Sequence, residues 1–260
     1  MNVIVILSVL LFILMQEVGG KRGTRSFLSL LLNMTVLYAA IILMAKNINP
    51  FFVTLVASVV ISCISLFFIN KINGKTISAF ISVFITLLLM ISFIYKLGTI
   101  SKIQGFGEEE YDEISSFNLY INIDFSKLLV CTMIMGLIGA VIDAAISISS
   151  AMNELYKNNP ILTKRELFKS GMNIGRDILA TMTNTIYFAF LGGYLALLIW
   201  FKDLSYSMGA IVNSKVFCTE ILQILCSSLG TTLIIPITAG VTSHILLRDK
   251  KEKKLTFHGE

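Results

Sequence analysis

The stretch GLIGAVIDAAISISSAMNEL, residues 136–155, carries Asp143 well inside an apolar segment and Glu154 near its end. Its other residues are mostly apolar or small, and it contains no proline. It overlaps an apolar run over 127–151 that is long enough to cross a bilayer as a helix. A charged carboxylate at that depth is costly, and residues of this kind mark ion or substrate paths. Asp143 is therefore the first candidate for a functional residue.

The composition is typical of an integral membrane protein. Of the 260 residues, 55% are hydrophobic and 14% are charged, whereas soluble domains carry roughly 25% charged residues. We expect an all-α transmembrane bundle of about seven spans. A signal peptide is the alternative for the first span, although no Lys or Arg precedes it and no small-x-small cleavage site follows it. The expected spans are 2–18, 27–45, 50–70, 77–98, 127–151, 178–201 and 217–247.

The basic residues predict the orientation of these spans. With the N-terminus outside, the inner segments hold 15 of the 21 Lys and Arg residues and the outer segments hold 6. Because cytoplasmic loops carry the excess of basic residues, we expect the N-terminus outside and the C-terminus inside. Residues 1–247 would form one transmembrane domain, and 248–260 a basic cytoplasmic tail. That tail is better explained as an anchor beside anionic lipid than as a nucleic-acid arm.

Two loops are long enough to have structure of their own. The outer loop over 99–126 contains GEEEYDEISS, which is either a solvated acidic loop or a vestibule that collects cations. The basic inner loop over 152–177 contains Thr163 and Glu166 at capping-box spacing. We expect a short helix to begin there, to lie on the membrane surface and to end at Gly171.

One face of the helix over 127–151 is small and polar. Gly136, Gly139, Asp143 and Ser147 recur at steps of three and four residues and so share this face, which another helix can approach closely. The next span is antiparallel to it and carries Thr181, Asn184 and Thr185 at a matching depth, counted at about 1.5 Å per residue. We expect Asp143 to form a hydrogen bond in that zone. The other expected helix-packing positions are Gly171, Gly175 and Pro236.

The surroundings expected for Asp143 favour a proton relay. No Lys or Arg in any span can reach it at mid-depth, so its carboxyl is expected to exchange a proton near neutral pH. Asp143, Ser147, Thr181, Asn184 and Thr185 are the candidate relay residues. The alternative is a structural role, in which Asp143 joins this helix to a neighbouring helix or subunit.

Catalysis and cofactors are not expected. An intramembrane aspartyl protease needs two facing Asp residues, and only Asp143 lies in the middle of a span. The sequence contains no C-x-x-C pair, no H-E-x-x-H and no Gly-rich phosphate loop, so we expect no metal site and no ATP-driven step.

Pro236 interrupts the last span and predicts a kink. The carbonyl that it frees, with Thr231, Thr232 and Thr238, would either line a pathway or lie in a packed kink. In the second case, the threonines bond to their own helix.

Three stretches carry a family resemblance. GLIGAVIDAAISISSAMNEL, ELFKSGMNIGRDILATMTNTIYFAFLGG and the N-terminal GGKRGTRSFLSLLLN resemble the YibE/F family of bacterial membrane proteins. The chain looks like the short, YibF-type member, because it lacks the long extracytoplasmic segment of a YibE-type partner. The resemblance implies a multi-pass protein of the bacterial plasma membrane.

A looser resemblance connects the same region with one permease half of SecD/SecF and other RND-type transporters. In those proteins, a helix carrying an Asp and a following helix carrying Thr and Asn form the proton path. Asp143 matches the relay position, and Asn184 and Thr185 match the facing residues. The chain has no large periplasmic domain and only one such half. The resemblance therefore implies a secondary, proton-coupled transporter that needs a second half, either a YibE-type partner or another copy.

Overall fold

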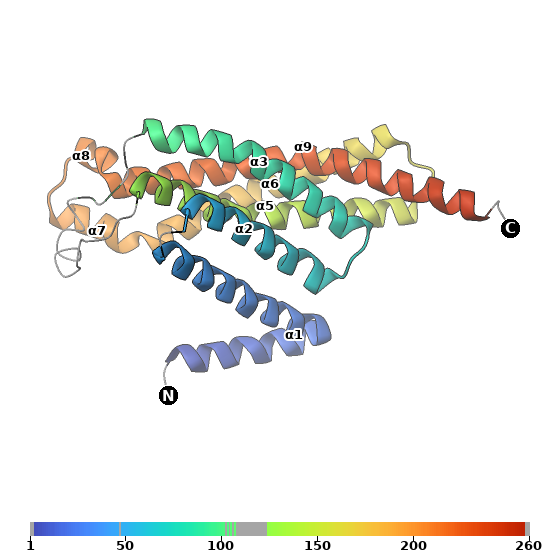
Figure 1. Ribbon diagram of the computed structural model, residues 1–260, viewed down its shortest axis with the longest axis horizontal. Helices are drawn as coiled ribbons and strands as arrows, with labels where there is room; N and C mark the ends of the chain where they lie inside the picture. Colours follow the sequence, from blue (N-terminus) through green and yellow to red (C-terminus); the bar gives the residue numbers. More distant parts are fainter. Residues whose placement is uncertain are drawn as a thin grey trace.

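The computed structural model describes residues 3–46, 48–101, 103, 105, 107 and 124–257, and these residues form an elongated helical bundle (Figure 1). No strand occurs among the described residues, so the all-α expectation is confirmed. The elements are α1 (Val3–Ala45), α2 (Pro50–Cys63), the π-helical turn η1 (Ile64–Phe68), α3 (Gly74–Ile100), α5 (Phe125–Asn158), α6 (Lys164–Gly193), α7 (Leu195–Asp203), α8 (Met208–Asn213) and α9 (Lys215–Phe257).

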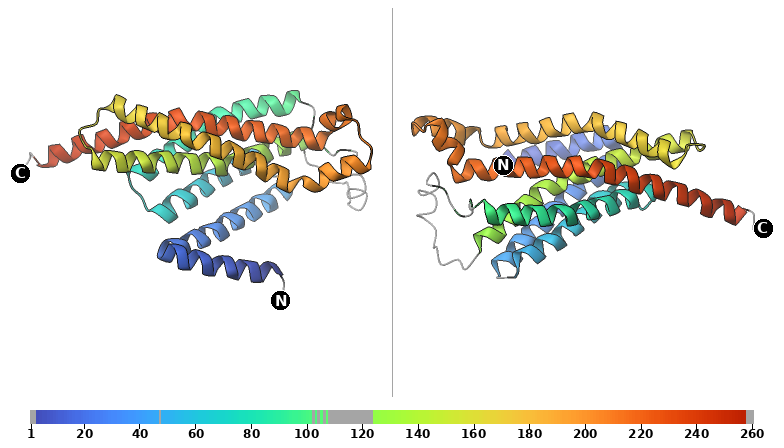
Figure 2. Two further views of the ribbon diagram at one scale, coloured as in Figure 1. Left: turned by 180° about the vertical axis from the view of Figure 1, so that it is seen from behind. Right: turned by 90° about the horizontal axis from the view of Figure 1, so that it is seen from above.

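Helix α1 combines the first two expected spans. It bends sharply at Gly20, whose φ of 54° lies in a region that side chains other than glycine rarely adopt. The two arms fold back on each other, and the first arm points away from the bundle (Figure 2). Phe12 and Phe27 pack across the bend with ring centroids 5.0 Å apart.

The helices that could cross a membrane number five in the described chain, or six if α6 and α7 are one span bent by 50°. Six differs from the expected seven because α1 is one helix where two spans were expected. The count is five if the bent α6–α7 pair, which covers the expected span over 178–201, is left out. Length and apolar composition alone qualify these helices. The seven-span count and the orientation therefore stay predictions.

The core lies where α5 packs against α3 and α9. Leu137, Ile134 and Met133 of α5 are fully buried there. Polar contacts also join the helices: the Thr242 hydroxyl of α9 donates to the Ser78 hydroxyl of α3 at 3.2 Å. One face of α5 is thus fully enclosed by other helices.

The inner loop was only partly predicted. The capping box at Thr163 and Glu166 is present, so the expected helix start is confirmed. The expected end at Gly171 is wrong, because α6 continues through Gly171 and Gly175 to Gly193. Both glycines lie in tight contact: a Cβ at Gly171 would be 2.5 Å from the Met152 sulfur, and one at Gly175 would be 2.2 Å from Ile235 Cγ2. A glycine that lets helices approach looks the same in sequence as one that ends a helix.

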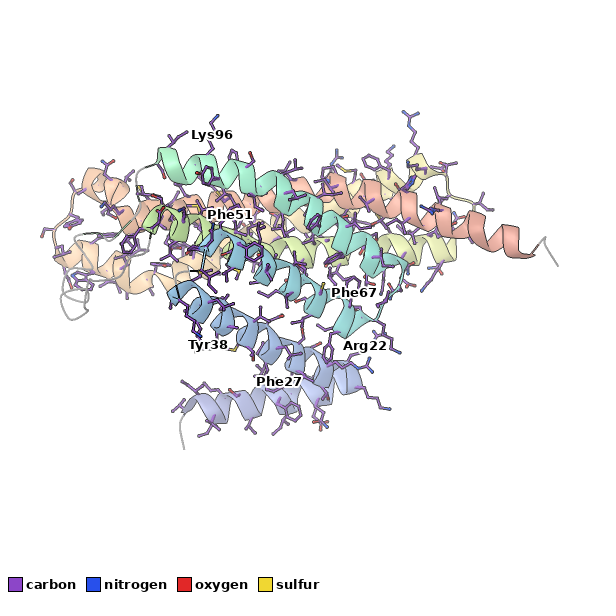
Figure 3. All side chains as sticks on the ribbon, viewed as in Figure 1. Arg22, Phe27, Tyr38, Phe51, Phe67 and Lys96 are labelled. Atoms are coloured by element: carbon purple, nitrogen blue, oxygen red, sulfur yellow. The ribbon has the colours of Figure 1, made fainter. Side chains whose placement is uncertain are left out.

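The segments rich in Lys and Arg gather at one end of the bundle. The bend of α1, the α2–α3 turn, the α5–α6 turn and the C-terminal part of α9 lie at that end, and α7 and α8 lie at the other (Figure 1). Figure 3 shows Arg22 at the α1 bend and Lys96 at the opposite end. The expected orientation would place this basic end on the inner side of the membrane, and that orientation stays a prediction.

Two expected regions are only partly described. Most of the acidic stretch in the outer loop, over 108–123, lies outside the described residues. Of the expected tail over 248–260, α9 includes residues through Phe257 as a continuous helix.

Candidate functional site

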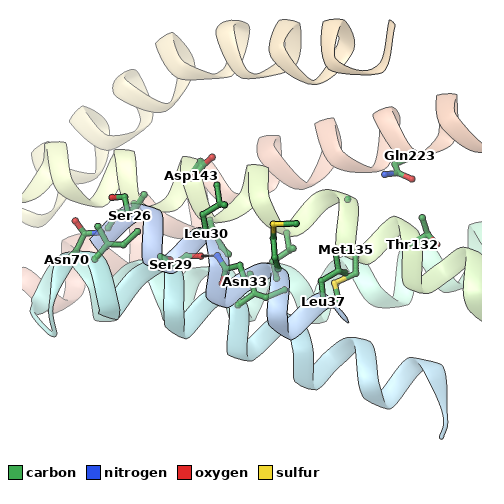
Figure 4. A pocket seen from close by; sticks show the side chains of 18 residues that line it. Ser26, Ser29, Leu30, Asn33, Leu37, Asn70, Thr132, Met135, Asp143 and Gln223 are labelled. Atoms are coloured by element: carbon green, nitrogen blue, oxygen red, sulfur yellow. Dashed lines mark hydrogen bonds between the residues drawn. The ribbon is translucent and has the colours of Figure 1, made fainter. Parts of the chain in front are cut away.

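A side-open cavity of about 740 Å³ lies along α5. Its walls come from the second arm of α1, from α2 with η1, and from α5, and Gln223 of α9 closes one part (Figure 4). Its polar lining includes Ser26, Ser29, Asn33, Thr132, Asp143 and Gln223.

Asp143 lies on the face of α5 that the core leaves open. Gly136, Gly139, Asp143 and Ser147 are all exposed in the isolated chain, whereas Ala144 and Ala145 beside them are buried. A Cβ at Gly139 would meet nothing within 4 Å. The small, polar face expected from the sequence therefore exists, but no helix of the described chain packs on it at Gly139.

Gln223 approaches the same face at Gly136. A Cβ at Gly136 would lie 2.2 Å from Gln223 Nε2, so the absence of a side chain there makes room for the amide. Gln223 Oε1 is buried and has no hydrogen-bond partner among the described residues. An oxygen in this state is costly in a membrane unless a ligand or water donates to it.

Asn33 provides a second such oxygen. Its Nδ2 donates to Ser65 Oγ at 3.0 Å, across from α1 to the π-helical turn η1. The Asn33 Oδ1 is buried and likewise has no partner within the described chain. Single π-turns are frequent at functional sites, and this one presents Ser65 to the cavity.

The structure does not bring Asp143 together with the expected partners on α6. Thr181 donates to the Ile178 carbonyl at 2.8 Å, and Thr185 donates to the Thr181 carbonyl at 2.9 Å. Both hydroxyls thus bond to their own helix, as threonines in helices commonly do. Thr181, Asn184 and Thr185 are exposed, and none of them lines the cavity.

Pro236 lies inside α9, which continues through it. Thr231 and Thr232 donate to the Ser228 carbonyl at 2.9 and 2.8 Å, as expected for a packed kink. Thr238 Oγ1 is buried without a partner among the described residues.

Sequence reasoning missed two residues near the start of α9. Glu220 accepts a hydrogen bond from the Tyr194 hydroxyl, which lies where α6 ends and α7 begins. Gln223 lies one turn further along and reaches the cavity. The available signal was two long polar side chains three residues apart at the start of an apolar run.

The part of the chain that the structure describes contains no candidate metal site. No group of three or more His, Cys, Asp or Glu side chains there could hold a metal ion. Asp143 is the one titratable side chain that lines the cavity among the described residues, and no Lys, Arg or His lines it. The cavity therefore offers hydrogen-bond acceptors and a single acid.

The comparisons with known proteins identify a family and no individual relative. Neither the curated proteins nor the solved structures include a significant match to this chain. The sequence profile described as YibE/F-like protein matches residues 7–248, which is nearly the whole chain. With its apolar helices, this match makes the protein membrane-embedded, and the chain belongs to the YibE/F-like family.

Proposed function

We propose that the protein is a permease-like subunit of a secondary, proton-coupled transporter in the bacterial plasma membrane. One observation carries this proposal: Asp143 lines a cavity with polar and apolar walls instead of lying sealed against a cation. Ionisable residues within membranes usually mark ion paths. We assign Asp143 the role of proton carrier, with Ser147 on the next turn of the same face.

The lining of the cavity supports proton exchange. No basic side chain among the described residues lines it, so no fixed cation holds Asp143 in its charged form. The open side leaves the carboxyl uncovered by the described part of the chain. Without an ion pair, the charged form of a carboxyl in a membrane is not stabilised, so the group can take up a proton instead of staying ionised.

The open face supports the need for a second half. In the isolated chain, the face with Gly139, Asp143 and Ser147 is uncovered, and so are Asn184 and Thr185 of α6. Small and polar residues suit a close helix–helix contact in a membrane. We propose that a YibE-type partner or a second copy covers both faces. Asn184, Thr181 and Thr185 would then lie near an incoming proton path. We propose no enzymatic activity for this chain.

The test measures protonation of Asp143 directly. The wild type and Asp143→Asn are purified from membranes in which a YibE-type partner is co-expressed, and infrared difference spectra are recorded across the neutral pH range. We expect the wild type to show a titrating carboxyl band that Asp143→Asn lacks, while the variant keeps its partner. Asp177→Asn, which removes an exposed acid from α6, is the matched control and should keep the band.

A structural role is the second candidate, and the same open face favours it. An uncovered stripe of small residues with one acid is also what an assembly interface looks like. In that case, Asp143→Asn would be degraded or would lose its partner, and no carboxyl band would titrate in the wild type. That result would overturn the transport proposal.

A further inference from the structure

We propose that the cavity beside Asp143 binds an amphiphilic organic cation with a primary amine group. This inference deepens the proposed function and rests on it, because the same carboxylate would meet both the proton and the substrate. It specifies the chemical class of the ligand. The evidence is the size, the charge and the unused hydrogen-bonding capacity of the cavity.

The size of the cavity suits an organic molecule. A volume of about 740 Å³ falls in the usual range for small-molecule sites, roughly 300–1,000 Å³. The polar groups are spread along it: Figure 4 shows Asp143 toward one end and Gln223 toward the other, with Asn33 between them. Gln223 contacts the helix at Gly136, which is about 10 Å from Asp143 along α5 at the helical rise per residue. Side-chain oxygens this far apart cannot coordinate the same metal ion.

The charge of the cavity selects the sign of the ligand. Asp143 is the one charged side chain that lines it among the described residues. An anion would lie beside this carboxylate with no cation to balance it. A cation would form a charge-assisted hydrogen bond to it, which is stronger than a bond between neutral groups.

The unused acceptors select a ligand with several N–H donors. Asn33 Oδ1 and Gln223 Oε1 are both buried, and neither has a partner among the described residues. A primary ammonium group carries three donors and no acceptor, as does the side chain of Lys. It can donate to the Asp143 carboxylate and has further donors for other acceptors, whereas a quaternary ammonium has no N–H to donate.

Much of the remaining lining is apolar and adaptable. It includes Leu30, Met34 and Leu37 of α1 and Met135, Ile138 and Ile142 of α5. Unbranched methionines adjust to ligands of different shape. The hydrocarbon or aromatic part of an amphiphilic amine would lie between these walls, with its ammonium group at Asp143.

Binding of dansylcadaverine tests the proposal. This fluorescent probe combines an aromatic group with a primary amine, and its N-acetylated form keeps the aromatic group but has no charge. The purified full chain is placed in nanodiscs of phosphatidylcholine, so that no anionic lipid attracts the probe, and empty nanodiscs give the baseline. We expect saturable fluorescence with the amine and none with the acetylated form.

Variants locate the site. We expect Asp143→Asn to weaken binding about tenfold or more, because it removes a charged hydrogen-bond partner, and Gln223→Leu to weaken it several-fold. Asp177→Asn, which lies outside the cavity, should bind as the wild type does. If Asp143→Asn does not fold, Gln223→Leu and the acetylated probe on the wild type still test the proposal.

Two results would overturn it. One is equal binding of the amine and the acetylated probe, which would make the cavity a lipid-like apolar space. The other is unchanged amine binding in both cavity variants. The proposed function can fail independently of this inference. If Asp143 titrates but no amine binds, the ligand class is refuted and the proton-relay proposal stands. Amine binding that depends on Asp143 without any titration would support the site and refute proton coupling.

Discussion

Polar residues on α6 and polar residues around the α5 cavity differ in how their hydrogen bonds are satisfied. On α6, Thr181 and Thr185 donate to carbonyls of their own helix. Around the α5 cavity, Asn33 Oδ1 and Gln223 Oε1 have no partner in the described chain. A hydroxyl can bond to its own backbone, whereas a carboxylate or an amide oxygen needs a donor from elsewhere. The unpaired oxygens therefore lie around the α5 cavity, whereas the α6 hydroxyls are satisfied within their own helix.

The largest effect is expected at Asp143. We expect Asp143→Asn to reduce proton-coupled flux about hundredfold or more, because a positioned proton-transfer group contributes that much. The measurement is the decay of a pH gradient in vesicles that contain the chain and its YibE-type partner, followed with an internal pH dye. Asp143→Glu should retain part of the flux. Equal flux in wild type and Asp143→Asn would show that the cavity carboxyl carries no proton.

The second effect concerns how tightly neighbouring atoms enclose one glycine of α6 and one glycine of α5. A Cβ at Gly175 of α6 would lie 2.2 Å from Ile235 Cγ2, whereas one at Gly139 of α5 would meet nothing within 4 Å. We expect Gly175→Ala to lower the free energy of unfolding by about 1–3 kcal/mol through overpacking. Gly139→Ala should be neutral, or stabilising by up to about 1 kcal/mol from helix propensity.

Denaturation of the purified chain in detergent compares these two glycine variants. Capture of the partner is measured on the same samples. If Gly139→Ala is stable alone but captures less partner, the open face of α5 is the interface with the second half. Equal destabilisation by both variants would mean that the face is already covered within the chain.

The third effect lies outside the membrane, at the start of α5. Asp124 Oδ1 accepts from the backbone N–H groups of Ser126 and Lys127 at 3.0 and 3.3 Å. The hydrogen bond from the Lys127 side chain, together with these N–H groups, lowers the pKa of Asp124. Because the folded state lowers this pKa, the stabilisation is present above the ordinary Asp range and is lost as the pH falls through the folded value.

We expect Asp124→Ala to cost about 1 kcal/mol at neutral pH, as loss of a helix cap does. The difference from wild type should shrink in acid. Thermal unfolding in detergent at neutral and acidic pH measures both effects. Asp124→Asn is the matched control, since Asn caps a helix equally well but does not titrate. A difference that is the same at both pH values would rule out the charged cap.

The smallest effect is expected at Thr185. Its hydroxyl already donates to the Thr181 carbonyl at 2.9 Å. Thr185→Val therefore removes a hydrogen bond within α6 and no hydrogen bond to a ligand. We expect proton flux to fall less than about threefold, because back-bonded threonines contribute little. The vesicle assay used for Asp143 measures it. A loss as large as that of Asp143→Asn would place the α6 threonines directly in the proton path.

The sequence alone determined the helical, membrane-embedded character of the protein. Apolar runs of about 20 residues can satisfy their backbone groups in lipid only as helices or closed barrels, and helical periodicity favours helices. The local pattern of Thr163 and Glu166 predicted where α6 begins, because a capping box involves only residues three positions apart. The face that carries Asp143 also followed from helical periodicity alone.

Only the tertiary structure decided what lies across from that face. Periodicity identifies which residues share a side of a helix, but the neighbour that covers this side depends on packing between distant segments. Asn33 meets Ser65, 32 positions away, and Gln223 of α9 reaches Gly136 of α5. The continuation of α6 through Gly171, which lies against Met152 and Ala239, depends on such contacts too. The sequence therefore identified the acid, and the packing of α1, α2 and α9 around α5 made its cavity.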